Sequence, residues 1–203
     1  MNDQMTPTVS LTKGQGISLT KTRPLLKSVR AILGWRVRET NGVEFDLDVS
    51  AFLLNAEGKC RPGQLDVVMY NEQTQKHPSG SVIHGGDNLE GSTDGSEAEF
   101  IAIDLSLVPH DIQKIAFTVS IHEAKARGQN FGQVNNAMIN IVDTSDNHVL
   151  ATADLSEEHD VETAMIVGEL YRKDQGWSFK FIDQGYAGGL MEMGKSYGFN
   201  FAP

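Results

Sequence analysis

Cysteine is nearly absent from this chain: Cys60 is the single one among 203 residues. One cysteine cannot form an intrachain disulfide, so the sequence excludes a disulfide-stapled fold and fits a reducing cytoplasm. It also argues against a zinc cluster, because no two of the six histidines have the helical i, i+4 spacing and no second thiolate is present. Redox chemistry by Cys60 itself is disfavoured, since one thiol cannot cycle alone through a disulfide.

Long hydrophobic runs are also missing. No uninterrupted apolar stretch approaches the roughly 20 residues that a membrane-spanning helix needs, and the first residues lack the basic and then apolar pattern of a secretory signal. The net charge of −10 argues against nucleic-acid binding, which needs a basic surface. We therefore expect a cytoplasmic protein without a membrane span.

Positive charge is absent from one long stretch. Between His77 and Gln113 there is no lysine or arginine, but there are seven carboxylates, which are Asp87, Glu90, Asp94, Glu97, Glu99, Asp104 and Asp111. Glycines punctuate residues 85–95 within it. Two carboxylates about 5 Å apart repel each other by about 3 kcal/mol at an effective dielectric of about 20. A fold that gathers them needs a cation, and oxygen ligands on a turn-rich loop favour calcium.

Apolar residues alternate with polar ones through most of the chain, which predicts strands rather than helices. Residues 9–20 read as a hairpin around Gly14-Gln15-Gly16, with Val9, Leu11, Ile17 and Leu19 facing inward. Further strands are expected at 29–37, 43–54, 66–70, 100–105, 115–121, 137–142, 149–154, 163–171 and 177–182, and short helices at 123–127 and 190–197. This pattern predicts an all-β fold, an antiparallel β-sandwich of about ten strands with a few short peripheral helices. Residues 1–8 form a short N-terminal extension, and residues 9–201 form a single domain.

A second acidic segment lies at residues 44–48. Side chains alternate along a strand, so Phe45, Leu47 and Val49 would face the core while Glu44, Asp46 and Asp48 face the other way. Asp46 and Asp48 would then be close enough to converge on one ion. The alternative is that this column is only the solvated face of a strand. The glycine-rich acidic loop favours a hard-cation site, although its spacing is not that of an EF-hand.

No catalytic constellation is evident, because the chain has neither a G-x-S-x-G elbow nor a P-loop. We therefore expect a binding protein and not an enzyme. One alternative is a metal-dependent phosphoesterase in which the carboxylates hold magnesium or manganese and His122 assists. Another is calcium-dependent membrane docking through the basic residues within 1–42, which are Lys13, Lys21, Arg23, Lys27, Arg30, Arg36 and Arg38.

Several long strings, in one order, match a known family. They are Val9-Ser-Leu-Thr-Lys-Gly, Leu33-Gly-Trp35, Phe45-Asp-Leu-Asp-Val-Ser-Ala-Phe-Leu-Leu54, Gly86-Asp-Asn-Leu-Glu-Gly91, residues 121–134, Glu162-Thr-Ala-Met165, Gly168-Glu-Leu-Tyr-Arg172 and Gln184-Gly-Tyr-Ala-Gly-Gly-Leu190. By these strings the chain resembles the TerD-type proteins of the tellurium-resistance and stress-response group. The resemblance runs from Val9 to Phe199.

The resemblance implies a calcium-binding β-sandwich. It implies that Asp46 and Asp48 bridge to the ion from the strand, that Asp87, Asn88 and Asp94 supply side-chain oxygens, and that Gly91 supplies a carbonyl oxygen. Glu97 and Glu99 are alternative further ligands. The family's role in tellurite resistance implies related tellurium-resistance proteins and an inner-membrane partner, met on the cytoplasmic side, as partners.

Overall fold

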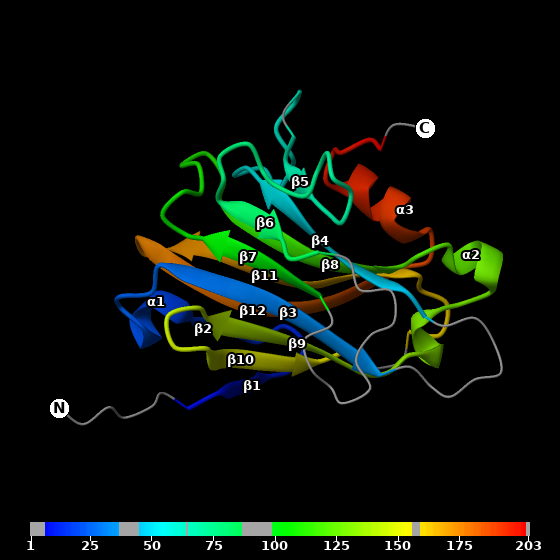
Figure 1. Ribbon diagram of the computed structural model, residues 1–203, viewed down its shortest axis with the longest axis horizontal. Coiled ribbons are helices and arrows are strands. Elements are labelled where there is room, and N and C mark those ends of the chain that lie inside the picture. Colours follow the sequence, from blue (N-terminus) through cyan, green and yellow to red (C-terminus); the bar gives the residue numbers. More distant parts are fainter. Residues whose placement is uncertain (1–6, 37–44, 64, 87–98, 156–158, 202–203) are drawn as a thin grey trace.

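The computed structural model describes residues 7–36, 45–63, 65–86, 99–155 and 159–201. Within these residues two six-stranded sheets stack face to face (Figure 1). Sheet A has the order β1 (Val9–Leu11), β10 (His148–Asp154), β9 (Asn135–Asp143), β3 (Ser28–Arg36), β7 (Glu99–Asp104) and β6 (Val82–His84). Sheet B has the order β2 (Gly16–Ser18), β12 (Gly176–Tyr186), β11 (Ala164–Lys173), β8 (Lys114–Ile121), β4 (Leu47–Leu54) and β5 (Val67–Val68). The all-β sandwich prediction is confirmed.

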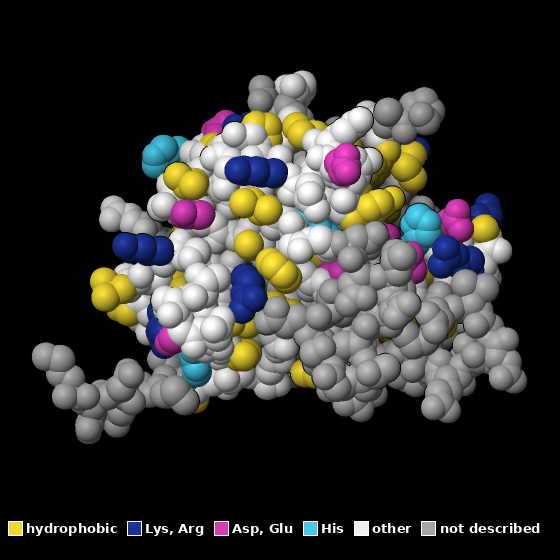
Figure 2. Space-filling model, in the orientation of Figure 1, with side chains coloured by type: hydrophobic (Ala, Val, Ile, Leu, Met, Phe, Trp, Pro, Cys, Tyr) yellow, Lys and Arg dark blue, Asp and Glu magenta, His cyan; other side chains and the backbone are white. Residues whose placement is uncertain are grey.

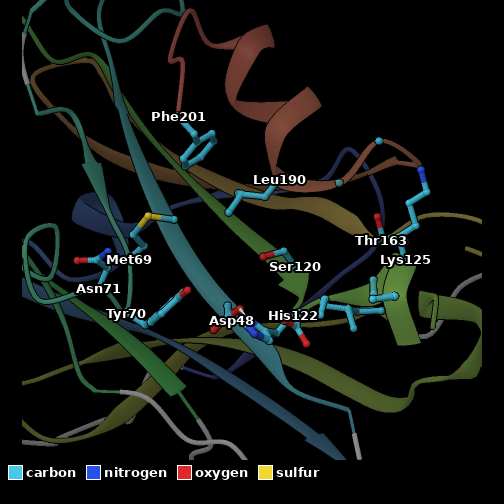
Figure 3. Close-up of a pocket in the computed structure, with 16 residues that line it drawn as sticks. Asp48, Met69, Tyr70, Asn71, Ser120, His122, Lys125, Thr163, Leu190 and Phe201 are labelled. Atoms are coloured by element: carbon cyan, nitrogen blue, oxygen red, sulfur yellow. Dashed lines mark ion pairs between the residues drawn. The ribbon is translucent and has the colours of Figure 1, made fainter. Parts of the chain in front are cut away.

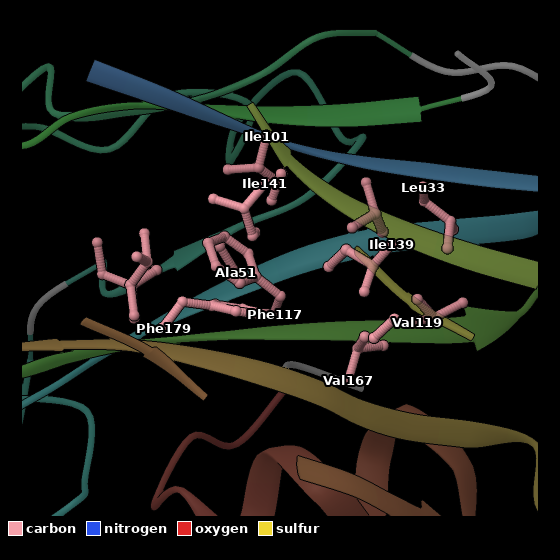
Figure 4. Close-up of a cluster of buried hydrophobic side chains, with 14 of the residues drawn as sticks. Leu33, Ala51, Ile101, Phe117, Val119, Ile139, Ile141, Val167 and Phe179 are labelled. Atoms are coloured by element: carbon pink, nitrogen blue, oxygen red, sulfur yellow. The ribbon is translucent and has the colours of Figure 1, made fainter. Parts of the chain in front are cut away.

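The main core lies between the sheets. Alternate residues of each strand point inward, as the period-two pattern requires. Figure 4 shows Leu33, Ile101, Ile139 and Ile141 of sheet A meeting Ala51, Phe117, Val119, Val167 and Phe179 of sheet B. These side chains are almost entirely buried. Their burial is the main favourable contribution to folding, since each large apolar side chain removed from water contributes about 1.5–3 kcal/mol.

The predicted hairpin at residues 9–20 is wrong, although its inward-facing residues are right. β1 pairs in parallel with β10 of sheet A, whereas β2 pairs antiparallel with β12 of sheet B. Gly14, with φ +82°, lets the chain turn from one sheet to the other. Leu11 and Leu19 are nevertheless buried, because both layers face the same core. Local alternation specifies which side faces the core but not which strand is the partner.

Helices cover part of the outer face of sheet B. The expected helices are found as α2 (Ala124–Arg127) and α3 (Gly189–Ser196), and two further short elements are α1 (Leu19–Thr22) and the 3-10 turn η1 (Phe131–Gln133). Beneath α3 a second apolar cluster forms around Phe52, whose ring centroid lies 5.3 Å from that of Tyr197 and 6.4 Å from that of Phe201. Both faces of β4 are therefore buried.

Candidate functional site: an acidic strand joined to the ends of an acidic loop

β4 places its acidic residues as the alternation predicts. Phe45, Leu47 and Val49 belong to the main core, and Asp48 points to the outer face of sheet B, where it lies opposite Ser120 of β8. Asp48 is not on a solvated face, however, because it is only 6% exposed. Burying a carboxylate is costly unless polar groups or a cation compensate it. The alternative of a merely wet strand face does not fit Asp48.

Asp48 lies at the floor of a cleft of about 590 Å³ on this outer face (Figure 3). The walls come from the segment after β5, from the start of α2 and from the start of α3, and they include Tyr70, Lys125 and Leu190. His122 stands beside Asp48, with its Nδ1 3.9 Å from Asp48 Oδ2. The backbone N–H of His122 donates to the carbonyl of Asp46 at 2.8 Å, which fixes this corner of the sheet.

The edge of β4 next to Asp48 is completed by side chains of the other sheet. β5 pairs only with Ala51 and Phe52, so it does not reach Val49. The N–H of Val49 donates instead to Glu99 Oε2 at 2.7 Å, and the carbonyl of Val49 accepts from His84 Nε2 at 3.1 Å. Glu99 and His84 therefore take the place of a neighbouring strand. We call these two residues the edge clamp.

The edge clamp is fully buried, and its hydrogen bonds define which nitrogen of His84 carries the proton. Both side chains have no exposed surface, and Glu99 Oε2 lies 3.7 Å from His84 Nε2. The Nδ1 of His84 accepts from the N–H of Gly86 at 3.1 Å, so Nε2 carries the proton that is donated to Val49. The buried Glu99 carboxylate thus accepts a backbone N–H, which is one of the polar contacts that such a group needs.

The edge clamp also brings the ends of the acidic loop to β4. Gly86 and Glu99 flank residues 87–98, and Gly85 N donates to the carbonyl of Phe100 at 2.8 Å to close the base of the loop. Gly85 is required here, because a Cβ atom would lie 2.3 Å from the Phe100 ring. Gly86 has φ +114°, a conformation that glycine adopts without strain. Both loop ends therefore lie beside the strand that carries Asp46 and Asp48.

The predicted ligands divide into two groups. Asp46, Asp48 and Glu99 are described: Asp48 is in β4, Asp46 directly precedes this strand, and Glu99 reaches it from β7. The others lie outside the described residues; they are Asp87, Asn88, Gly91, Asp94 and Glu97. Among the described residues no three His, Cys, Asp or Glu side chains form a group that could hold a metal ion. The calcium site stays a prediction.

Asp66 is an acidic residue whose role the sequence did not reveal. It is fully buried before β5, where Arg61 Nη2 donates to its Oδ1 at 2.6 Å, Arg61 Nε to its Oδ2 at 2.9 Å, and His77 Nε2 approaches Oδ1 at 3.3 Å. Burial alone would raise the pKa of Asp66, but the Arg61 and His77 hydrogen bonds hold this pKa well below its ordinary value. Arg61 also pairs with Asp111 at 3.0 Å. Asp66 is thus part of a structural ion-pair network.

Cys60 lies beside this network. Burial, and secondly the nearby Asp66 carboxylate, raises the pKa of its thiol to about 12. Since the thiolate is the reactive form, Cys60 is held as an unreactive thiol at neutral pH.

Comparisons with known proteins agree with this fold. The sequence profile described as the TerD domain matches residues 7–197. The chain is 47% identical to tellurium resistance protein TerD of Serratia marcescens, over 95% of this chain and 98% of that protein. It is also 47% identical to general stress protein 16U of Bacillus subtilis, over 94% of this chain and 97% of that protein.

A solved structure, that of a homologue of telluride resistance protein (TerD) from Streptomyces coelicolor, superposes with a TM-score of 0.69 at 21% identity. It covers 87% of this chain and 99% of its own, which shows a common fold. No helix among the described residues is long and apolar enough to cross a membrane. On the extent of these matches, the chain belongs to the TerD domain family, whose members include tellurium resistance and general stress proteins.

Proposed function

We propose that this protein is a calcium-binding interaction module that acts in a cytoplasmic tellurite-resistance and general stress response, and that it is not an enzyme. The family membership supports the stress role. The observation that carries the calcium site is the edge clamp, which attaches both ends of the acidic loop to β4 beside Asp48.

The residues present suit a hard cation. Asp46 and Asp48 supply carboxylate oxygens from the start of β4, and the loop sequence adds Asp87, Asn88 and Asp94 with the Gly91 carbonyl. Such an oxygen set matches the six to eight ligands that calcium takes. Bound calcium would offset the mutual repulsion of these carboxylates and hold the loop against β4. This would create an ordered surface for a partner.

Glu99 and Glu97 have different roles in this proposal. Glu99 Oε2 already accepts the Val49 N–H, so we assign Glu99 to positioning the loop. Glu97 is left as the further acidic candidate ligand.

Calcium titration tests the proposal. Ligand binding to the folded state raises stability by RT ln(1 + [L]/Kd), about 2.7 kcal/mol at a hundred times Kd. Calorimetry should show heat of binding, and melting should occur at a higher temperature with calcium than with EDTA. Asp48→Asn and Asp87→Asn should each remove most of this shift, whereas Glu57→Gln, a change of one exposed charge in the turn after β4, should not. Absence of both heat and shift in the unaltered protein would rule the site out.

Related chains of the same system are the proposed partners. Serratia marcescens carries relatives named tellurium resistance protein TerX and TerZ in addition to TerD. We propose that such chains bind this protein in a calcium-dependent way, and that an inner-membrane partner places the complex at the inner face of the membrane. The membrane partner rests on the family resemblance alone. Co-purification from cells with calcium, and its loss with EDTA, checks the first part, and fractionation of the cells checks the second.

One observation favours a second candidate function. His122 lies 3.9 Å from Asp48 in a cleft of about 590 Å³, which suits a metal-dependent phosphoesterase in which His122 transfers a proton. Turnover of a generic phosphodiester with magnesium or manganese, abolished in both Asp48→Asn and His122→Gln, would support it. Equal background rates in the unaltered protein and both variants would rule it out.

A further inference from the structure

A basic pocket lies near the edge of sheet B that is opposite to β4. β2 and β4 are separated by three strands in this sheet. The pocket has a volume of about 350 Å³, and its lining includes Lys21, Lys173 and Lys180 together with Ser18, Tyr171 and Ser178. No sequence motif predicts this pocket, because its lysines come from three separate elements: α1, the end of β11 and the middle of β12.

The strand register explains why these side chains meet. Trp177, Phe179 and Phe181 of β12 belong to the main core, so Ser178 and Lys180 point to the outer face. Ser178 lies opposite Ser18 of β2 and Tyr171 of β11. Three hydroxyl-bearing residues therefore form one row across three neighbouring strands.

The next row of residues on this face contains Lys180 and a glycine, so no bulky side chain fills the pocket there. Lys180 lies opposite Gly16 of β2. A Cβ atom at Gly16 would lie 2.8 Å from the carbonyl oxygen of Phe179 and 3.4 Å from the Lys180 side chain. Glycine at this position therefore permits the close approach of β2 to β12 and keeps bulk away from the lysine.

The charge of the pocket is opposite to that of the chain. Three lysines and one carboxylate, Asp174, give it a formal charge of +2 (3 − 1), while the whole chain carries −10. Lys21 lies 3.3 Å from Asp174, but both side chains are more than half exposed, and exposed pairs of this kind are weak. Within the described part of the chain, neither Lys173 nor Lys180 makes an ion pair. Glu169 of β11 lies opposite Lys180, but it pairs with Lys114 at 3.2 Å, so two ammonium groups remain for a ligand.

We propose that this pocket binds the phosphate group of a phosphate monoester. Such a group carries a charge of about −1.5 to −2 at neutral pH and presents three acceptor oxygens. The lysine ammonium groups match its charge, and the hydroxyls of Ser18, Tyr171 and Ser178 are neutral donors for the remaining lone pairs. A nucleic acid would need an extended basic surface. The net charge of −10 argues against one, and on the face in Figure 2 basic and acidic side chains are interspersed.

The site is independent of the calcium proposal, so it is tested in EDTA. The probes are inorganic phosphate and glycerol 3-phosphate, followed by calorimetry and by the amide shifts of residues 171–180. Lys173→Gln and Lys180→Gln should each weaken binding about tenfold, as expected for the loss of one charge-assisted contact. Lys195→Gln, which removes an exposed lysine of α3, should change binding less than about twofold. No binding of either probe, or equal weakening by all three variants, would overturn the proposal.

Vesicles separate a soluble phosphate ester from a lipid headgroup. The unaltered protein in EDTA is mixed with phosphatidylcholine vesicles with and without phosphatidic acid. Flotation only with phosphatidic acid, lost in Lys180→Gln and competed by glycerol 3-phosphate, would identify a lipid headgroup as the source. Binding of the soluble probes without flotation would identify a soluble ester. Flotation that Lys195→Gln reduces as much as Lys180→Gln would show a general charge effect and overturn the proposal.

Discussion

Replacing Glu99 with alanine removes the acceptor of the Val49 N–H and the carboxylate beside His84. A buried N–H without an acceptor costs about 1–3 kcal/mol, and the space left by the buried side chain adds to this cost. We expect a loss of about 3 kcal/mol in the free energy of unfolding. In a domain of this size each kcal/mol shifts Tm by roughly 2–4 °C, so Glu99→Ala should melt about 6–12 °C lower.

Glu99→Gln separates positioning from ligation. The glutamine keeps a side-chain oxygen that can accept the Val49 N–H, but it removes the negative charge. If Glu99 only positions the loop, calcium should still raise Tm of this variant about as much as in the unaltered protein. If Glu99 holds the ion, the calcium shift should be lost to the same extent as in Asp48→Asn.

The assay is thermal unfolding followed by circular dichroism, in EDTA and in calcium, together with hydrogen exchange of the Val49 amide. Glu57→Gln is the matched control, because it removes one exposed carboxylate at the far end of β4 from the cleft. Unchanged melting and unchanged Val49 exchange in Glu99→Ala would refute the edge clamp. Loss of the calcium shift in Glu99→Gln but not in the control would refute its positioning role.

Three further predictions concern the surroundings of the site. Arg61→Gln leaves the buried Asp66 carboxylate without its main partner and should cost about 3–5 kcal/mol at neutral pH. Because the folded-state pKa of Asp66 lies below its ordinary value of 3.8, its contribution is present above that value and lost as the pH falls below it. The difference between this variant and the unaltered protein, measured by urea unfolding, should therefore narrow below about pH 4; a constant difference would contradict the assignment. Cys60, with its raised pKa, should react with a thiol reagent only when the protein unfolds, and rapid labelling of the native protein would disprove its burial. Phe52→Ala should cost about 3–5 kcal/mol because Phe52 joins β4 to Tyr197 and Phe201, and a cost below about 1 kcal/mol in urea unfolding would show that this cluster is not packed.

Local alternation predicted most strands and the direction of their side chains. Residues 45–49 were oriented correctly, because a core on one face requires a period of two. The pairing of β1 with β10, and of β2 with β12, could not be predicted from the sequence, since partners separated by more than a hundred residues leave no local signal. β6 was missed because a strand of three residues is too short to show a period. The burial of Asp48 could not be predicted for a similar reason, because segments distant in sequence build the cleft around it.

The shortness of β5 gives the acidic loop its place. A strand edge that no other strand covers leaves N–H and carbonyl groups that must be satisfied. Had β5 continued past Val68, which pairs with Ala51, its next residues would have paired with Ser50 and Val49 and displaced both residues of the edge clamp. Because β5 ends early, Val49 of β4 instead forms hydrogen bonds with Glu99 and His84, which lie on either side of the loop in sequence. The same backbone groups that complete the sandwich thereby place Gly86 and Glu99, the residues that flank the loop, beside β4.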